Sequence, residues 1–150
     1  MSFFLFRALS TFFIRAAIVL PLISCSTNRE VPGLNDALQI LNNHGGTTHK
    51  MPTIVYAPVK YRSLSYYNRL EDILYINSRL WGSETKIRQE MVALHELGHA
   101  ILKRPHLNEL QSDGCGTSIM LYNINVECYI KYKEYYLNEL FENKEQFYHN

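Results

Sequence analysis

The spacing of apolar residues along the chain predicts three helices. Leu34, Leu38 and Leu41 recur at helical intervals, and the glycines at 45–46 would end that helix. A longer helix should begin near Ser83 or Thr85 and end before Pro105. Its apolar face would consist of Ile87, Met91, Leu94, Leu97 and Ile101. A third, amphipathic helix is expected over residues 126–148, with a packed stripe of Val126, Tyr129, Ile130, Leu137, Leu140 and Phe141.

Two stretches between the first two helices have the composition of strands. Residues 52–59 are β-branched and aromatic, although Pro58 indicates an edge or a strand end. A second strand is expected at 73–76, and the residues just before it could form a further strand or a loop. Residues 107–124 lack periodicity and should be a loop. The order of elements predicts an α+β domain.

The N-terminus has the pattern of a secretory signal. Residues 1–24 contain two arginines, a short apolar run and small residues before a cleavage point. Leu22-Ile23-Ser24-Cys25 resembles a bacterial lipobox, in which the cysteine becomes a lipid anchor. The alternatives are an ordinary cleaved signal or a buried helix. We expect residues 25–33 to be anchor and tether and 34–150 to be the folded domain. Ser26 favours the outer over the inner membrane.

Charge excludes one class of partner. Removing residues 1–24 removes Arg7 and Arg15, so 13 of the 15 basic residues remain against 14 acidic ones. A nucleic-acid partner would need a clustered basic face, and none is visible, so we expect no such partner. A monomer is expected.

Cys115 and Cys128 could form a disulfide in an oxidising compartment or remain two reduced thiols.

The segment His95-Glu96-Leu97-Gly98-His99 is an HExxH motif. Histidines four residues apart lie on one helical face, so both imidazoles can reach one metal at about 2.0–2.1 Å. Glu96 would stand beside the metal and take a proton from water that the metal has activated. Short motifs also arise by chance, and then His95 and His99 would be ordinary core or surface histidines.

A third metal ligand must come from outside the helix. His106 follows His99 by seven residues, which is about 10.5 Å along a continued helix and too far to share a metal. Pro105 disfavours helical geometry at the residue before it, so the chain can break and turn back. Otherwise His106 is a solvated loop residue. The alternative third ligands are Glu109, Asp113 and Cys115, and Asp113 could instead accept the ring N–H of a ligating histidine.

The segment Ser118-Ile119-Met120-Leu121-Tyr122 completes a resemblance to the metzincin zinc peptidases, and to small bacterial lipoprotein peptidases with HELGHxxLxRxH followed by SIM. The resemblance covers roughly residues 83–125. It implies a small zincin-like domain with a mixed sheet, in which His95, His99 and His106 bind Zn²⁺. Met120 would form the floor of the site, and Tyr122 would be an auxiliary ligand or oxyanion donor. Without that role, Met120 would be simply core and Tyr122 simply surface.

The sequence departs from the metzincin pattern HExxHxxGxxH in two places. Leu102 stands where the glycine would be, and Pro105 stands where the third histidine would be. The glycine permits a sharp turn after the second ligand. In this chain the turn must be built differently, and residues 103–105 are the candidates.

These observations predict a zinc metallopeptidase of the bacterial envelope, with a peptide or protein substrate. Glu96 would act as general base and pass the proton to the leaving amine. The strand at 52–59 or 73–76 would form the upper edge of the cleft and pair with an extended peptide. Zinc is inferred from the ligand type, which iron, cobalt or nickel also accept. The alternatives are a non-catalytic lipoprotein with a structural metal or a partner-binding role, and a hydrolase of cell-wall peptide cross-links.

Overall fold

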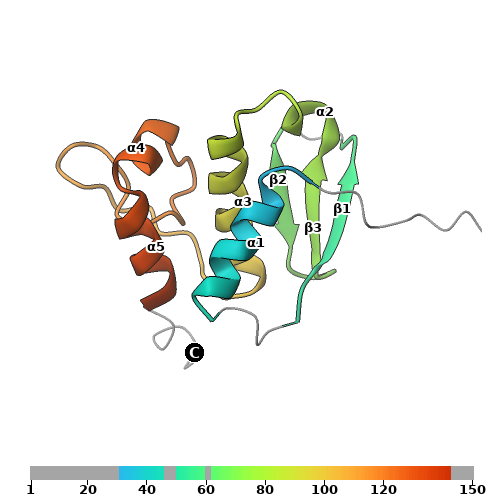
Figure 1. Cartoon of the computed structure of the whole chain (residues 1–150), viewed down its shortest axis with the longest axis horizontal. Coiled ribbons are helices and arrows are strands. Elements are labelled where there is room, and N and C mark those ends of the chain that lie inside the picture. The colour runs from blue at the N-terminus through green and yellow to red at the C-terminus, as the bar shows by residue number, and fades with distance from the viewer. Residues whose placement is uncertain (1–30, 46–49, 60–61, 143–150) are drawn as a thin grey trace, which may run out of the picture.

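The computed structural model describes residues 31–45, 50–59 and 62–142, and over these residues the chain is an α+β domain, as predicted (Figure 1). The expected signal peptide and the lipidation site Cys25 lie outside the described residues. Within them, no helix has both the length and the apolar character needed to cross a membrane. The elements are α1 (Leu34–Asn43), β1 (Thr53–Ala57), β2 (Ser65–Asn68), β3 (Ile73–Asn77), α2 (Ser78–Trp81), α3 (Lys86–Ala100), α4 (Val126–Lys131) and α5 (Lys133–Glu142).

The three strands form a mixed sheet in the order β1-β3-β2. β1 pairs in parallel with β3, and β2 pairs with β3 in the antiparallel direction. Both predicted strands are present, and the segment before the second one, which the sequence left open, forms β2. β3 therefore lies in the centre, with both of its edges paired, and β2 is an edge strand.

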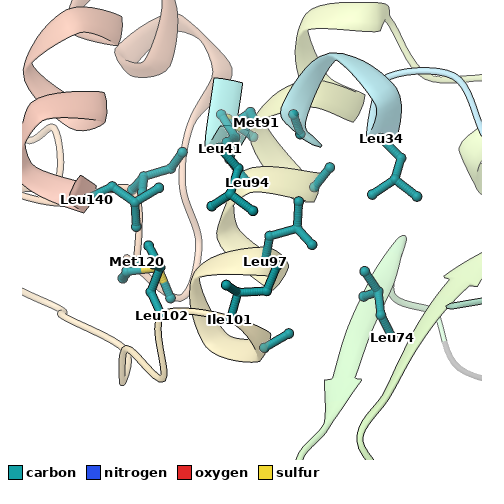
Figure 2. Packing of buried hydrophobic residues seen from close by; sticks show 14 of the residues in the cluster. Leu34, Leu41, Leu74, Met91, Leu94, Leu97, Ile101, Leu102, Met120 and Leu140 are labelled. Carbon is teal, nitrogen blue, oxygen red and sulfur yellow. The ribbon is translucent and has the colours of Figure 1, made fainter. Parts of the chain in front are cut away.

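α3 lies in the middle of the molecule, between the sheet on one side and α4 and α5 on the other (Figure 1). Figure 2 shows Leu34 and Leu74 on the sheet side of this helix, and Met120 and Leu140 on the opposite side. Because both sides are covered, α3 buries much more than one apolar stripe, including the polar His95 and Glu96. A helix enclosed in this way can hold functional groups at fixed positions inside the fold.

The ends of α3 follow from local hydrogen bonds. Its first turn is capped by Thr85, whose side chain accepts from the backbone N–H of Arg88 at 3.3 Å, which agrees with the predicted start. The helix ends at Ala100, several residues before Pro105. Lys103 adopts a left-handed conformation (φ 56°), and the backbone N–H of Arg104 turns back to the carbonyl of Gly98 at 3.1 Å. The helix therefore ends before Pro105, the residue on which the predicted break was based.

The single helix expected over 126–148 is two short helices, α4 and α5, separated at Tyr132, and residues 143–148 lie outside the described residues. Ile130 was predicted to pack, but 59% of its surface is exposed. Tyr136, which the stripe omitted, is fully buried. Tyr132 has a non-helical backbone and interrupts the helix, so one helical period does not describe both segments.

The loop between α3 and α4 is ordered by backbone pairing and by a disulfide. Leu110 and Gly116 form an isolated antiparallel bridge, and the backbone N–H of Leu107 donates to the carbonyl of Met120 at 3.0 Å. Cys115 and Cys128 are joined by a disulfide, which settles the alternative left open by the sequence. The loop thus returns to its starting point and places Met120 next to the end of α3.

Candidate metal centre

The structure brings the three predicted metal ligands together. The Nε2 atoms of His95 and His99 are 3.1 Å apart, those of His99 and His106 are 3.1 Å apart, and those of His95 and His106 are 3.2 Å apart. Nitrogen ligands at about 2.0–2.1 Å from a tetrahedral metal would be separated by roughly 3.3–3.4 Å. The triangle of nitrogen atoms is therefore of the size that one metal ion requires.

The hydrogen bonds of two of these rings fix which nitrogen carries the proton. His95 Nδ1 donates to the carbonyl of Ile119 at 2.9 Å, and His99 Nδ1 donates to the carbonyl of Arg104 at 2.6 Å. A carbonyl can only accept, so in the neutral rings the Nε2 atoms carry lone pairs. Two lone pairs 3.1 Å apart cannot share a hydrogen bond. A cation in the centre satisfies them, so the donor set fits a metal.

Burial keeps these rings neutral. Desolvation lowers the pKa of His95 to about 4 and also lowers the pKa of His99, because an imidazolium is costly to bury. Metal binding needs the neutral form of the ring. Near neutral pH the two helix histidines are therefore ready to bind without first losing a proton.

The alternative ligands lie elsewhere or are chemically blocked. Within the described part of the chain, the group that could hold a metal around these rings consists of the three histidines alone. Cys115 is in the disulfide and cannot serve as a thiolate. Asp113 accepts from Tyr132 at 2.7 Å and from Lys131 at 2.9 Å, so it fixes α4 to the loop. The ring N–H groups of His95 and His99 are held by backbone carbonyls and not by Asp113.

The turn that delivers His106 is built around Lys103. Counted back from the third histidine, Lys103 occupies the place of the glycine in the pattern HExxHxxGxxH, and it has the positive φ that a glycine adopts easily. The sequence therefore contains one additional residue before this position, and the turn has a lysine where a positive φ would favour glycine. This confirms residues 103–105 as the segment that makes the turn.

A buried clamp holds the turn in place. The guanidinium of Arg104 donates to the backbone carbonyl of Glu139 at 2.7 Å and forms an ion pair with the carboxylate of that residue. The other oxygen of the carboxylate accepts from Ser118 Oγ at 2.5 Å, and Ser118 Oγ accepts from the backbone N–H of Met120 at 3.0 Å. Glu139 of α5 thus joins the turn before His106 to the segment around Met120. Sequence analysis missed this clamp, because no local pattern connects residues so far apart.

Met120 is fully buried beside the motif helix. A Cβ atom added to Gly98 would lie 2.6 Å from the sulfur of Met120, so the glycine inside HExxH leaves the space that the thioether fills. The neighbouring Ile119 supplies the carbonyl that orients His95. Met120 therefore packs against the motif helix and does not line the cleft, and its predicted role as the floor of the site stays a prediction.

Glu96 is a buried carboxylate directly beside these ligands, with 8% of its surface exposed. Its Oε1 accepts from Ser65 Oγ at 3.1 Å, and the backbone N–H of Tyr67 also donates to the carboxylate. Burial raises the pKa of Glu96 to about 7, and these two hydrogen bonds oppose the shift. Ser65 and Tyr67 were not predicted to belong to the site. The only hint in the sequence was their alternation in a segment that could be a strand.

A cleft of about 670 Å³ opens over the histidines and Glu96. One wall consists of β2 and its flanking residues, and the other consists of the turn that carries His106. The strand along the cleft is therefore β2, and the prediction that 52–59 or 73–76 would form this edge was wrong. β3 is paired on both sides, and β1 is on the far edge of the sheet.

Tyr122 lies at the rim of the same cleft. Its side chain is exposed, and its ring centroid is 5.1 Å from that of His106, in an edge-on arrangement. Its backbone N–H donates to Asn108 Oδ1 at 3.3 Å, which holds this part of the loop against the segment after His106. The structure thus brings Tyr122 beside the third histidine, where an exposed phenol faces the cleft.

No protein-family model and no curated protein sequence matches this chain. Among solved structures, one match is the metallopeptidase zymogen of Methanocaldococcus jannaschii jannalysin. The TM-score is 0.41 and the identity 15%, over 75% of this chain and 88% of the other. A likeness this distant says little about chemistry. The chemistry of the site follows from the imidazoles, the carboxylate and the cleft of this chain.

Proposed function

We propose that this protein is a zinc-dependent peptidase of the bacterial envelope. His95, His99 and His106 would hold the ion, and Glu96 would be the general base. The observation that carries the proposal is the position of Glu96, a buried carboxylate at the wall of a cleft that also contains three converging imidazole nitrogens. A site that only staples the fold has no use for such a carboxylate and is closed by a fourth protein ligand.

A zinc ion in this place supplies Lewis acidity, which makes water a nucleophile near neutral pH. Glu96 takes the proton of the attacking water as its oxygen adds to the scissile carbonyl carbon. The same carboxyl then gives that proton to the nitrogen of the breaking C–N bond, so an acid and an amine leave. Ser65 Oγ and the backbone N–H of Tyr67 hold the carboxylate in position for both transfers. The phenol of Tyr122 would donate a hydrogen bond to the oxyanion.

The substrate would bind as an additional strand. β2 is the edge strand beside the cleft, and an extended peptide can pair with the backbone of such an edge. Ser65 and Tyr67 belong to this strand and also contact Glu96. A peptide paired with β2 is therefore placed directly over the general base.

The proposed location rests on the sequence, since Cys25 lies in a lipobox-like segment. The disulfide supports it, because such bonds persist in oxidising compartments and are rare in the cytosol. A lipid on Cys25 would anchor a monomer to the membrane, with the outer membrane favoured over the inner one.

Metal content and peptide cleavage, measured on the same preparations, test the proposal. The full-length protein, its Glu96→Gln variant and its His106→Ala variant would be dialysed and analysed for zinc, and then given a mixture of random octapeptides. We expect about one zinc per chain in wild type and Glu96→Gln, and a large loss in His106→Ala. Cleavage by Glu96→Gln should fall by about 10²–10⁴-fold. Equal cleavage by wild type and Glu96→Gln would exclude the proposed mechanism.

A further inference from the structure

The residues that line the cleft are unequally charged. Glu96 is the single acidic residue among them, and it is buried. Three basic residues line the same cleft: Arg69, Lys103 and Arg104. The charge of Arg104 is balanced by Glu139 in the clamp. Arg69 and Lys103 are exposed, so they are the two cations that a ligand in the cleft can reach.

Lys103 lies across one end of the cleft. Its backbone belongs to the turn between His99 and His106, whereas its ammonium lies 5.7 Å from the centre of the Tyr67 ring on β2. The same ammonium donates to the carbonyl of Ala100 at 2.6 Å, so the side chain is held close to the end of α3. A positive charge is therefore held between the turn after α3 and β2, the two walls of the cleft.

The backbone at Lys103 is strained, which gives a reason to ask what the side chain does. A non-glycine residue in the left-handed region is strained, and such strain is concentrated at functional sites. A glycine here would build the same turn without that strain. The side chain of a lysine, in contrast, brings a charge to the wall of the cleft.

Nearby acids do not neutralise this end of the cleft. The Tyr67 hydroxyl and the charges of Lys50 and Lys103 lower the pKa of the Asp72 carboxyl. This carboxylate already accepts from the Tyr67 hydroxyl at 2.8 Å and pairs with Lys50 at 3.6 Å. Arg69 projects from the turn that follows β2, where Asn68 Oδ1 accepts from the backbone N–H of Leu70 at 3.1 Å. Lys50, Arg69 and Lys103 together exceed the acids of this turn, Glu71 and Asp72, by one charge.

We propose, on the basis of the peptidase function above, that Lys103 and Arg69 select substrates with a carboxylate at this end of the cleft. The carboxylate would belong to an aspartate or glutamate side chain, or to the C-terminus of the peptide. Because the peptide lies along β2, the charged group falls at the end where β2 leads into the turn with Arg69. An ammonium and a guanidinium facing one carboxylate make charge-assisted hydrogen bonds.

Cleavage of a peptide library would test this preference directly. The zinc-loaded full-length protein would be given random octapeptides, and mass spectrometry would identify the residues on each side of the broken bond. We expect Asp and Glu to be enriched over Asn and Gln at one position on one side. The best Glu peptide should be cleaved about fivefold faster than its Gln counterpart, as expected for one exposed charge pair. Peptides with free and amidated C-termini would separate the two sources of carboxylate.

Variants would show whether the named residues carry the preference. Lys103→Gly keeps the turn, because glycine adopts its φ without strain, and Arg69→Gln changes an exposed side chain. Either change should reduce the preference for Glu over Gln peptides, whereas Lys103→Arg should keep it. Lys86→Gln is the matched control, since it removes one exposed positive charge from the first turn of α3, away from the cleft lining. It should leave the preference as in wild type.

Binding separates this proposal from the peptidase function itself. Anisotropy of a labelled peptide with three Glu residues, compared with its three-Gln counterpart, needs no cleavage and can use the Glu96→Gln variant. Tighter binding of the acidic peptide, lost in Lys103→Gly, supports carboxylate selection even if no peptide is cleaved. Equal binding and cleavage of acidic and neutral peptides would overturn it, and so would a preference that survives in a Lys103→Gly/Arg69→Gln double variant.

Discussion

The two halves of the metal centre are held in different ways. His95 and His99 come from a regular helix, so the helical repeat alone puts both rings on one face. His106 comes from an irregular segment and is positioned by contacts with distant parts of the chain, above all Glu139 and Met120. The backbone positions of the two helix histidines (the helical half) therefore follow from local structure, whereas the position of His106 (the loop half), and the carbonyls that orient the helix histidines, depend on the tertiary fold.

Breaking the clamp between Arg104 and Glu139 should have the largest effect on stability and on zinc affinity, because it disrupts the loop half. In Glu139→Ala, Arg104 would remain buried without its carboxylate partner, which typically costs about 3–5 kcal/mol of unfolding free energy. Zinc affinity should fall by about 10–100-fold, because the carbonyl of Arg104 orients His99. Urea unfolding and competition with a zinc chelator measure the two effects.

Glu84→Ala is the matched control in the helical half. It removes a partly exposed ion pair with Arg88 at 3.3 Å at the start of α3, which should cost about 0.5 kcal/mol and leave zinc affinity unchanged. A double variant, Arg104→Met/Glu139→Leu, should be more stable than Glu139→Ala because no charge stays buried alone. Similar losses in Glu84→Ala and Glu139→Ala would contradict the distinction between the two halves.

Opening the disulfide should have the next largest effect. Cys115 and Cys128 are 13 residues apart, and a loop of about this length is expected to contribute roughly 2–4 kcal/mol. Wild type should therefore unfold at lower urea concentration after addition of dithiothreitol. A Cys115→Ala/Cys128→Ala variant should unfold near the reduced protein and be insensitive to dithiothreitol. If the reductant leaves the wild-type midpoint in place, the disulfide does not stabilise the loop half.

The smallest effect is expected at Asp113, and its pH dependence sharpens the comparison. Hydrogen bonds from Tyr132 and Lys131, and from the backbone N–H of Cys115, hold the pKa of this carboxyl well below its usual range. A lowered pKa means that the ionised form stabilises the fold above about pH 4, and that this contribution is lost as pH falls toward the lower pKa. Asp113→Asn should thus be less stable than wild type at pH 7, and the gap in unfolding free energy should shrink below pH 4. A gap that widens in acid would contradict this assignment.

Local patterns predicted the helical half of the site, and the α+β class with it. The motif spacing, the cap at Thr85 and the break before His106 are properties of neighbouring residues, so they can be recognised in one sequence. The strands at 53–57 and 73–77 were recognised for the same reason.

The remaining features depend on contacts between distant segments. The position of β2 at the cleft follows from strand order, which a sequence pattern does not determine. Ser65 reaches Glu96 across the boundary between sheet and helix, and Arg104 reaches Glu139 across the loop. Ile130 was misplaced because the break at Tyr132 has no strong local cause such as a proline or glycine.

The dependence of the third histidine on Glu139 also has a consequence for how the protein is made. A ribosome produces α3 well before α5, so the HExxH helix exists for a time without the residue that clamps the turn after it. During that interval His106 has no fixed position, and a nascent chain would hold a metal through two histidines only. Under the proposed function, hydrolytic competence would therefore arrive late in biosynthesis, when α5 docks, and the unfinished polypeptide would be harmless to its neighbours.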